Sequence, residues 1–229
     1  CYISVGGVKL MAEVIKVIGK NAFVQVFEST RGMRVGDEAE FEGHMLEVTL
    51  GPGMLSRNYD GLQNDLDKME GVFLKRGEYT FPLDNDKLWD FKPLAKVGDK
   101  VAAGGWLGEV DENFQPHKIM VPFTFKGEYT VKSLKEAGQY TIGEVIAVLT
   151  DETGKDVEVT MIQRWPVKRA ITCYKEKPRP YKLLETGVRT IDTVNPIVEG
   201  GTGFIPGPFG TGKTVLQHAI SKQAEADIV

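Results

Sequence analysis

Hydrophobic and polar residues alternate over short runs in the first part of the chain, a pattern typical of β-strands. Residues 12–28, AEVIKVIGKNAFVQVFE, hold two Val/Ile-rich runs that flank Gly19, Lys20 and Asn21 and predict a hairpin. Residues 30–50 repeat short alternating runs between turn glycines. This pattern fits a small β-barrel or sandwich, and we assign an N-terminal β-barrel to residues 1–55.

The alternation stops at residues 51–69, GPGMLSRNYDGLQNDLDKM, where Gly-Pro-Gly is followed by a polar stretch. Glycine and proline interrupt regular structure, and the polar stretch predicts a short helical piece. We therefore assign residues 56–90 to a connecting segment between two β-rich regions.

A second β-rich region follows, which we assign to residues 91–167. Glycines stand at turn spacing in residues 96–110, KVGDKVAAGGWLGEV, and a further hairpin is expected around Thr153 and Gly154. We predict a compact all-β insert, similar to the barrel-sandwich shape of lipoyl and biotinyl domains. Residues 171–187 then hold two prolines, which a buried strand does not tolerate, and predict a linker.

The pattern changes from Gly187 onward. We expect a helix onset in residues 188–201, a short apolar strand at residues 202–205, TGFI, a glycine loop, and a helix over residues 213–226 with apolar residues at helical spacing. The last four residues, ADIV, read as the start of another strand. Residues 168–229 thus predict the incomplete start of an α/β P-loop NTPase domain, and the whole chain has a mixed fold.

Composition narrows the possible classes of protein. The 229 residues carry a net charge of −4, which argues against nonspecific nucleic-acid binding and a polybasic membrane anchor. No apolar run approaches membrane-spanning length, so we expect no direct membrane insertion and a cytoplasmic chain. Cys1 and Cys173 predict reduced, structural thiols, and the scattered His44, His117 and His218 give no metal-binding spacing.

The segment GPFGTGKT, residues 207–214, matches the spacing G-x-x-x-x-G-K-[ST] of phosphate-binding loops. Glycines let successive backbone N–H groups converge on a phosphate, and the following helix adds its positive N-terminal end. Lys213, the candidate catalytic residue, would reach the β- and γ-phosphates, and the Thr214 hydroxyl would hold Mg²⁺. The alternative is a glycine turn that happens to precede an amphipathic helix. The predicted nucleotide-binding residues are Gly207, Pro208, Phe209, Gly210, Thr211, Gly212, Lys213, Thr214 and Val215.

Residues 205–218, IPGPFGTGKTVLQH, closely resemble the phosphate loop of the catalytic A subunit of V-type and archaeal-type rotary ATPases. Further segments resemble that subunit in the same order along the whole chain. They are LGPGMLSRNYDGLQNDL (50–66), HKIMVP (117–122), QRWPVK (163–168) and RPYKLLETGVRTIDT (179–193). The strand-rich insert fits the extra domain that separates this subunit from its F-type relatives.

The resemblance implies an ATP-binding catalytic subunit that uses ATP or ADP with Mg²⁺ and couples ATP hydrolysis or synthesis to H⁺ or Na⁺ movement. It implies three such subunits alternating with three B subunits, together with central and peripheral stalk subunits, and an arginine contributed by the neighbouring B subunit. The complex would be peripheral to a membrane on its cytoplasmic side, without nucleic acid.

The resemblance also marks what we do not find in these residues. The family's water-polarising glutamate lies in a Gly-Glu-Arg segment just after the strand that ADIV would begin, and its Walker B Asp lies further on. We interpret the chain as the N-terminal portion of the subunit and expect it to be inactive alone. Glu225 and Asp227 fall at the predicted helix end and take neither role.

Two rival functions stay open at this point. A noncatalytic nucleotide-binding scaffold would keep the fold and lose turnover, although the intact Lys213-Thr214 pair argues against it. A lipoyl- or biotinyl-like carrier would display a modified lysine, here Lys118, at a hairpin tip.

Overall fold

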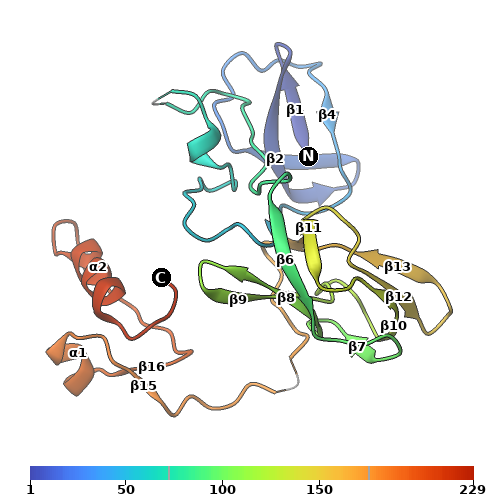
Figure 1. Ribbon diagram of the computed structural model, residues 1–229. Helices are drawn as coiled ribbons and strands as arrows, with labels where there is room; N and C mark the ends of the chain where they lie inside the picture. Colours follow the sequence, from blue (N-terminus) through green and yellow to red (C-terminus); the bar gives the residue numbers. More distant parts are fainter. Residues whose placement is uncertain (72, 175) are drawn as a thin grey trace. The chain divides into compact units, whose positions relative to one another are not determined.

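The computed structural model describes residues 1–71, 73–174 and 176–229 and divides into two compact units, Cys1–Tyr174 and Lys175–Val229 (Figure 1). Strands dominate the first unit, and two α-helices lie in the second. None of the helices in the described ranges is long and apolar enough to cross a membrane. The fold is therefore β-rich, followed by a short α/β segment.

The N-terminal sheet is antiparallel, with the strand order β3-β2-β1-β4. Its strands are β1 (Tyr2–Val5), β2 (Val8–Ile18), β3 (Asn21–Val26) and β4 (Ala39–Glu40). Gly19 adopts a φ of +59° in the turn between β2 and β3, which confirms the hairpin expected there. Ile3, Val5 and Leu10 are buried together under the sheet, because alternate residues of each strand face the same side.

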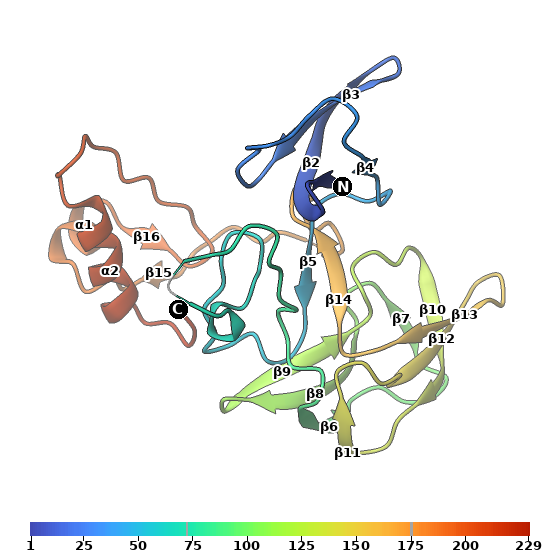
Figure 2. The same cartoon turned by 90° about the horizontal axis from the view of Figure 1, so that it is seen from above.

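In the structure the irregular stretch expected at residues 56–90 begins earlier, directly after β5 (Glu47–Leu50), which pairs antiparallel with β14 (Gln163–Pro166), and it ends before β6 (Leu88–Pro93) (Figure 2). From here on, the connecting segment means residues 51–87. In the part of this segment that the structure describes, regular structure is limited to one 3₁₀ turn, η1 (Leu66–Lys68), and an isolated bridge between Tyr59 and Asp65. The expected short helical piece is thus a single turn.

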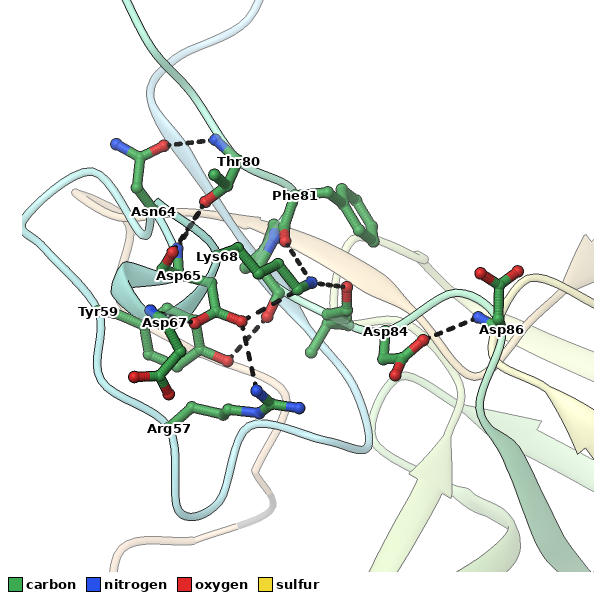
Figure 3. A network of polar contacts seen from close by, with 12 residues as sticks. Arg57, Tyr59, Asn64, Asp65, Asp67, Lys68, Thr80, Phe81, Asp84 and Asp86 are labelled. Atoms are coloured by element: carbon green, nitrogen blue, oxygen red, sulfur yellow. Dashed lines mark hydrogen bonds and ion pairs between the residues drawn. The ribbon is translucent and has the colours of Figure 1, made fainter. Parts of the chain in front are cut away.

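Side-chain hydrogen bonds hold this segment where regular secondary structure is lacking (Figure 3). The buried Asp65 donates its backbone N–H to Thr80 Oγ1 at 2.7 Å, and the Thr80 N–H donates to Asn64 Oδ1 at 2.9 Å. Lys68 Nζ donates to the carbonyl of Leu83 at 2.8 Å. Polar side chains satisfy backbone groups here that a sheet or helix would otherwise satisfy.

The strands of the insert (Figure 1) form two four-stranded sheets. Apolar side chains of this region form two buried clusters. The first sheet has the order β11-β6-β8-β9, with β11 (Gly138–Thr141), β6 (Leu88–Pro93), β8 (Trp106–Glu112) and β9 (Gln115–Met120). The second has the order β13-β12-β10-β7, with β13 (Asp156–Val159), β12 (Ala147–Asp151), β10 (Glu128–Leu134) and β7 (Lys100–Ala102). The hairpin expected around Thr153 and Gly154 joins β12 to β13.

Two clusters of buried side chains form the core of the insert. The first includes Trp89 and Phe91, and Leu83 from the connecting segment belongs to the same cluster, with Met54 packed against it. The second includes Leu107 and Leu149. The connecting segment and the insert therefore share the first cluster, whereas the buried residues of the second cluster all come from the insert.

A buried carboxylate ties the β8–β9 hairpin to the connecting segment. Glu112 is 2% exposed, and its Oε1 accepts the N–H groups of Gly53 at 2.7 Å and Leu55 at 2.9 Å. Its Oε2 lies 2.6 Å from His117 Nδ1. Burial raises the pKa of Glu112, but the hydrogen bonds from His117, Leu55 and Gly53 outweigh burial and hold the pKa below its ordinary value. We call Glu112 with these partners the Glu112 anchor.

The second unit has little regular structure. β15 (Leu183–Leu184) pairs antiparallel with β16 (Ile197–Val198), α1 (Arg189–Val194) lies between them in the chain, and α2 (Lys213–Gln223) follows. The strands expected at residues 202–205 and 226–229 do not form. A strand exists through its ladder partner, and none of the described strands lies beside either segment.

α2 confirms the predicted helix but ends at Gln223, three residues earlier than expected. Glu225 and Asp227 thus lie beyond the helix, and the Glu225 N–H donates to the carbonyl of Glu185 at 3.3 Å. Among the described residues, neither carboxylate forms a hydrogen bond or an ion pair with the glycine loop.

Candidate functional site

The loop at residues 207–214 adopts backbone angles that favour glycine. Gly210 and Gly212 have φ values of +78° and +81°, in the left-handed region. A Cβ added to Gly207 would lie 2.6 Å from Thr211 Oγ1, and that hydroxyl donates to the carbonyl of Pro208 at 2.8 Å. The loop therefore closes tightly around position 207, where an added side chain would displace the Thr211 hydroxyl.

Lys213 lies at the first position of α2 and reaches back over the loop. Its Nζ donates to the carbonyl of Gly207 and, at 2.7 Å, to the carbonyl of Pro208. A lysine ammonium has three N–H donors, so one remains for another acceptor. The loop thus encloses a positive charge at the place where the motif calls for a phosphate-binding lysine.

The N-terminus of α2 supplies further donors. Gly212 is the N-cap residue, and it provides no side-chain hydrogen bond to the helix. The first N–H groups of a helix have no partner within the helix, and the helix dipole places partial positive charge there. Thr214 and Val215 belong to this first turn and are exposed, Val215 to 73%. This end of α2 therefore suits an anion.

The remaining loop residues contribute in different ways. Phe209 is fully exposed, and Pro208 has no N–H to donate, so Pro208 contributes shape and a carbonyl acceptor for Lys213 and Thr211. The residues fit a phosphate group on geometric grounds, because glycine-only backbone angles, a lysine and a free helix N-terminus meet in one loop.

Lys118, the residue of the carrier hypothesis, is placed differently from what that hypothesis requires. It lies within β9, where its Nζ binds the Glu109 carboxylate and sits 5.0 Å from the centre of the Trp106 ring. The tip of the β8–β9 hairpin is formed instead by Asn113 and Phe114. Lys118 is therefore not displayed at a hairpin tip, and the carrier hypothesis is wrong on this point.

Two functional-looking arrangements escaped the sequence analysis. One is the Glu112 anchor, and the other is a contact between Asp192 and the buried Thr186 in the second unit. The first joins residues that are far apart in the chain, and the second joins residues across an irregular turn. Neither produces a periodic pattern in the sequence. The nearest hint was the segment ETGVRTID, quoted only for its resemblance.

Models of one family match the chain in order along its length. The β-barrel domain of the ATP synthase alpha/beta family matches residues 1–43, the barrel-sandwich domain of the ATP synthase alpha/beta subunit matches residues 80–168, and the nucleotide-binding domain of the family matches residues 187–229. The glycine loop lies in the last of these, so the site described above belongs to a nucleotide-binding domain.

Curated relatives extend the similarity over the complete chain. The V-type ATP synthase alpha chain of Treponema denticola is 50% identical over 100% of this chain and 39% of its own length. The V-type ATP synthase alpha chain 1 of Treponema pallidum is 48% identical with the same coverage, and the alpha chain of Protochlamydia amoebophila is 46% identical over 99% of this chain. The chain spans about two fifths of the length of these relatives. With all three domain types matched in order, the chain belongs to the ATP synthase alpha/beta family.

Proposed function

We propose that this chain is the N-terminal part of the catalytic A subunit of a V-type or archaeal-type rotary ATPase or ATP synthase. In that role it binds ATP or ADP and takes part in coupling ATP hydrolysis or synthesis to H⁺ or Na⁺ transport. The observation that carries the proposal is the loop at residues 207–214. Its glycines adopt positive φ values, and Lys213, at the start of α2, donates to the Pro208 carbonyl within the loop. The similarity to V-type ATP synthase alpha chains supports the choice of this family member.

Different groups of the loop are proposed to bind different parts of a nucleoside triphosphate. Backbone N–H groups of residues 210–214 bind phosphate oxygens, and Lys213 exchanges its carbonyl acceptors at Gly207 and Pro208 for β- and γ-phosphate oxygens. The Thr214 hydroxyl would hold Mg²⁺, which supplies charge neutralisation at the phosphates when bound. Pro208 and the Thr211 hydroxyl keep the loop curled around this position.

The proposed partners follow from the same assignment. In the complete protein, three copies of this subunit alternate with three B subunits, and a B-subunit arginine stabilises charge on the transferring phosphoryl group. Central and peripheral stalk subunits connect the assembly to a membrane sector, so the subunit is peripheral to the membrane on the cytoplasmic side. These partners are inferred from the family and belong to the proposal.

Lys213→Ala in the full-length subunit tests the proposal directly. We expect the ATPase rate of the assembled complex to fall by about 10²-fold or more, because a positioned charge at the transferring phosphate is lost. Lys222→Ala is the matched control, since Lys222 lies in the last turn of the same helix. Steady-state rates within about threefold of wild type for Lys213→Ala would reject the assignment.

Thr214→Ala separates the metal role from phosphate binding. We expect it to raise the Mg²⁺ concentration that half-maximal turnover requires, while metal-free ADP binding changes little, because the hydroxyl is assigned to the cation. Thr214→Ser keeps the hydroxyl and should restore the wild-type Mg²⁺ titration. An unchanged Mg²⁺ titration in Thr214→Ala would refute this role.

A further inference from the structure

The phosphate-binding loop is presented by a helix that is held at its opposite end. The last turn of α2 meets the turn at residues 185–187, where the Glu225 N–H donates to the Glu185 carbonyl at 3.3 Å. Gly187 has a φ of +72°, and a Cβ added there would lie 2.6 Å from Gln223 Oε1 and 2.9 Å from Gln223 Cβ. Contact this close requires glycine at position 187.

Asp192, in α1, fixes the shape of that turn. Its Oδ1 accepts the Thr186 backbone N–H at 3.0 Å and the Thr186 hydroxyl at 2.7 Å, and Thr186 is fully buried. The Thr186 hydroxyl in turn accepts the Val188 N–H at 3.2 Å. The hydrogen bonds from Thr186, and a weaker one from Gly187, hold the pKa of Asp192 below its ordinary value, so Asp192 is charged at neutral pH.

Among the described residues, α2 makes its closest packing contacts at its last turn. None of its residues is buried, although Leu216, Ala219 and Ile220 are partly covered. An eleven-residue helix is about 16 Å long and behaves as a stiff rod. A tilt of about 10° at its C-terminal end moves its N-terminus by about 3 Å, which is enough to break hydrogen bonds made there. The position of the last turn therefore influences where Lys213 and Thr214 lie.

We propose that Asp192 is a positioning residue for the phosphate-binding loop. It acts through Thr186 and Gly187 on the end of α2, and so sets the direction in which Lys213 meets the phosphates of a nucleoside di- or triphosphate. The inference rests on the proposed function, because it takes the loop at residues 207–214 as the phosphate site. Asp192 itself does not touch the nucleotide.

The experiment compares Thr186→Val and Thr186→Ser in the full-length subunit, with Asp192→Asn as a second variant. Thr186→Val removes the hydroxyl and keeps the volume, whereas Thr186→Ser keeps the hydroxyl. Thr193→Val is the matched control, since Thr193 is an exposed α1 residue whose hydroxyl donates to the Arg189 carbonyl. The dissociation constant of Mg²⁺-ADP is measured by calorimetry, and the melting temperature is measured without nucleotide.

We expect Thr186→Val and Asp192→Asn to raise the dissociation constant about tenfold or more, and Thr186→Ser and Thr193→Val to stay within about threefold. Combination with Lys213→Ala provides a readout that general destabilisation would not change. If Asp192 acts by presenting Lys213, Asp192→Asn adds little further loss of affinity in the Lys213→Ala background. If Asp192 only stabilises the fold, the two losses add.

The outcomes separate this inference from the proposed function. A wild-type subunit that does not bind Mg²⁺-ADP overturns both. A wild-type subunit that binds, together with Thr186→Val and Asp192→Asn proteins that melt earlier but bind equally well, overturns only the positioning role. Should Asp192→Asn fail to fold, the Thr186→Val and Thr186→Ser pair decides the question in the same way.

Discussion

The two units of this chain differ in which contacts hold their described residues in place. In Cys1–Tyr174, three clusters of buried apolar side chains support the sheets. In residues 176–229, Thr186 is the one buried residue, and the glycine loop is shaped by positive φ values and by hydrogen bonds from Thr211 and Lys213. Among these residues, burial of apolar area holds the first unit, whereas local polar geometry shapes the loop at residues 207–214, as suits a binding loop.

Removing a large side chain from each unit tests this contrast most strongly. Phe91 is 1% exposed, so Phe91→Ala should lower the free energy of unfolding by about 3–5 kcal/mol. Phe209 is fully exposed, so Phe209→Ala should change it by less than about 0.5 kcal/mol. Urea titrations of both variants provide the measurement, and equal losses would remove the distinction between the units.

The next largest effect should come from the Glu112 anchor, a polar element in the apolar unit. Glu112→Ala leaves the N–H groups of Gly53 and Leu55 without their acceptor, at a cost of about 1–3 kcal/mol. Glu109→Ala is the control on the same strand, because Glu109 pairs with Lys118 in a partly exposed position, and its loss should cost less than that of Glu112. Hydrogen exchange of the Gly53 and Leu55 amides should accelerate only in Glu112→Ala. Unchanged exchange of both amides would show that packing, not the carboxylate, holds the segment.

Acid should weaken the same anchor. The pKa of Glu112 is lower in the folded state than its ordinary value of 4.5, so its stabilisation is fully present above that pH. The stabilisation is then lost as the pH falls through the lower, folded-state pKa. We expect protection of the Leu55 amide to decline below about pH 4.5 in wild type, relative to core amides such as that of Leu149. In Glu112→Gln this decline should be absent, and a decline of equal size there would assign it to other carboxylates.

The smallest effect on stability is expected at Lys118. We interpret this residue as a structural side chain that pairs with Glu109 and carries no covalently attached group. Lys118→Arg keeps the charge opposite Glu109 and should change the free energy of unfolding by less than about 0.5 kcal/mol. The intact mass of the purified protein should equal that of the unmodified chain at this residue. A covalently attached group on Lys118 would contradict this interpretation and would support a carrier role for the first unit.

The sequence predicted what depends on neighbouring residues. The hairpin around Gly19 and the glycine loop at Gly207–Thr214 could both be predicted, because each depends on glycines and residue spacing within a few consecutive positions. The strand expected at residues 202–205 failed, because a strand needs a partner that local sequence does not specify. The contact of Glu112 with Gly53 was invisible for a related reason, since it joins residues far apart in the chain.

The pairing of β5 with β14 has a consequence for folding and for evolution. Leu50 lies opposite Gln163, so the two ends of the stretch 51–162 lie next to each other at this strand pair. The entropy cost of closing such a loop grows only with the logarithm of its length, about 0.6 kcal/mol for each doubling. The exposed loops between these strands can therefore change length at small cost while the strand pair and the buried clusters stay intact.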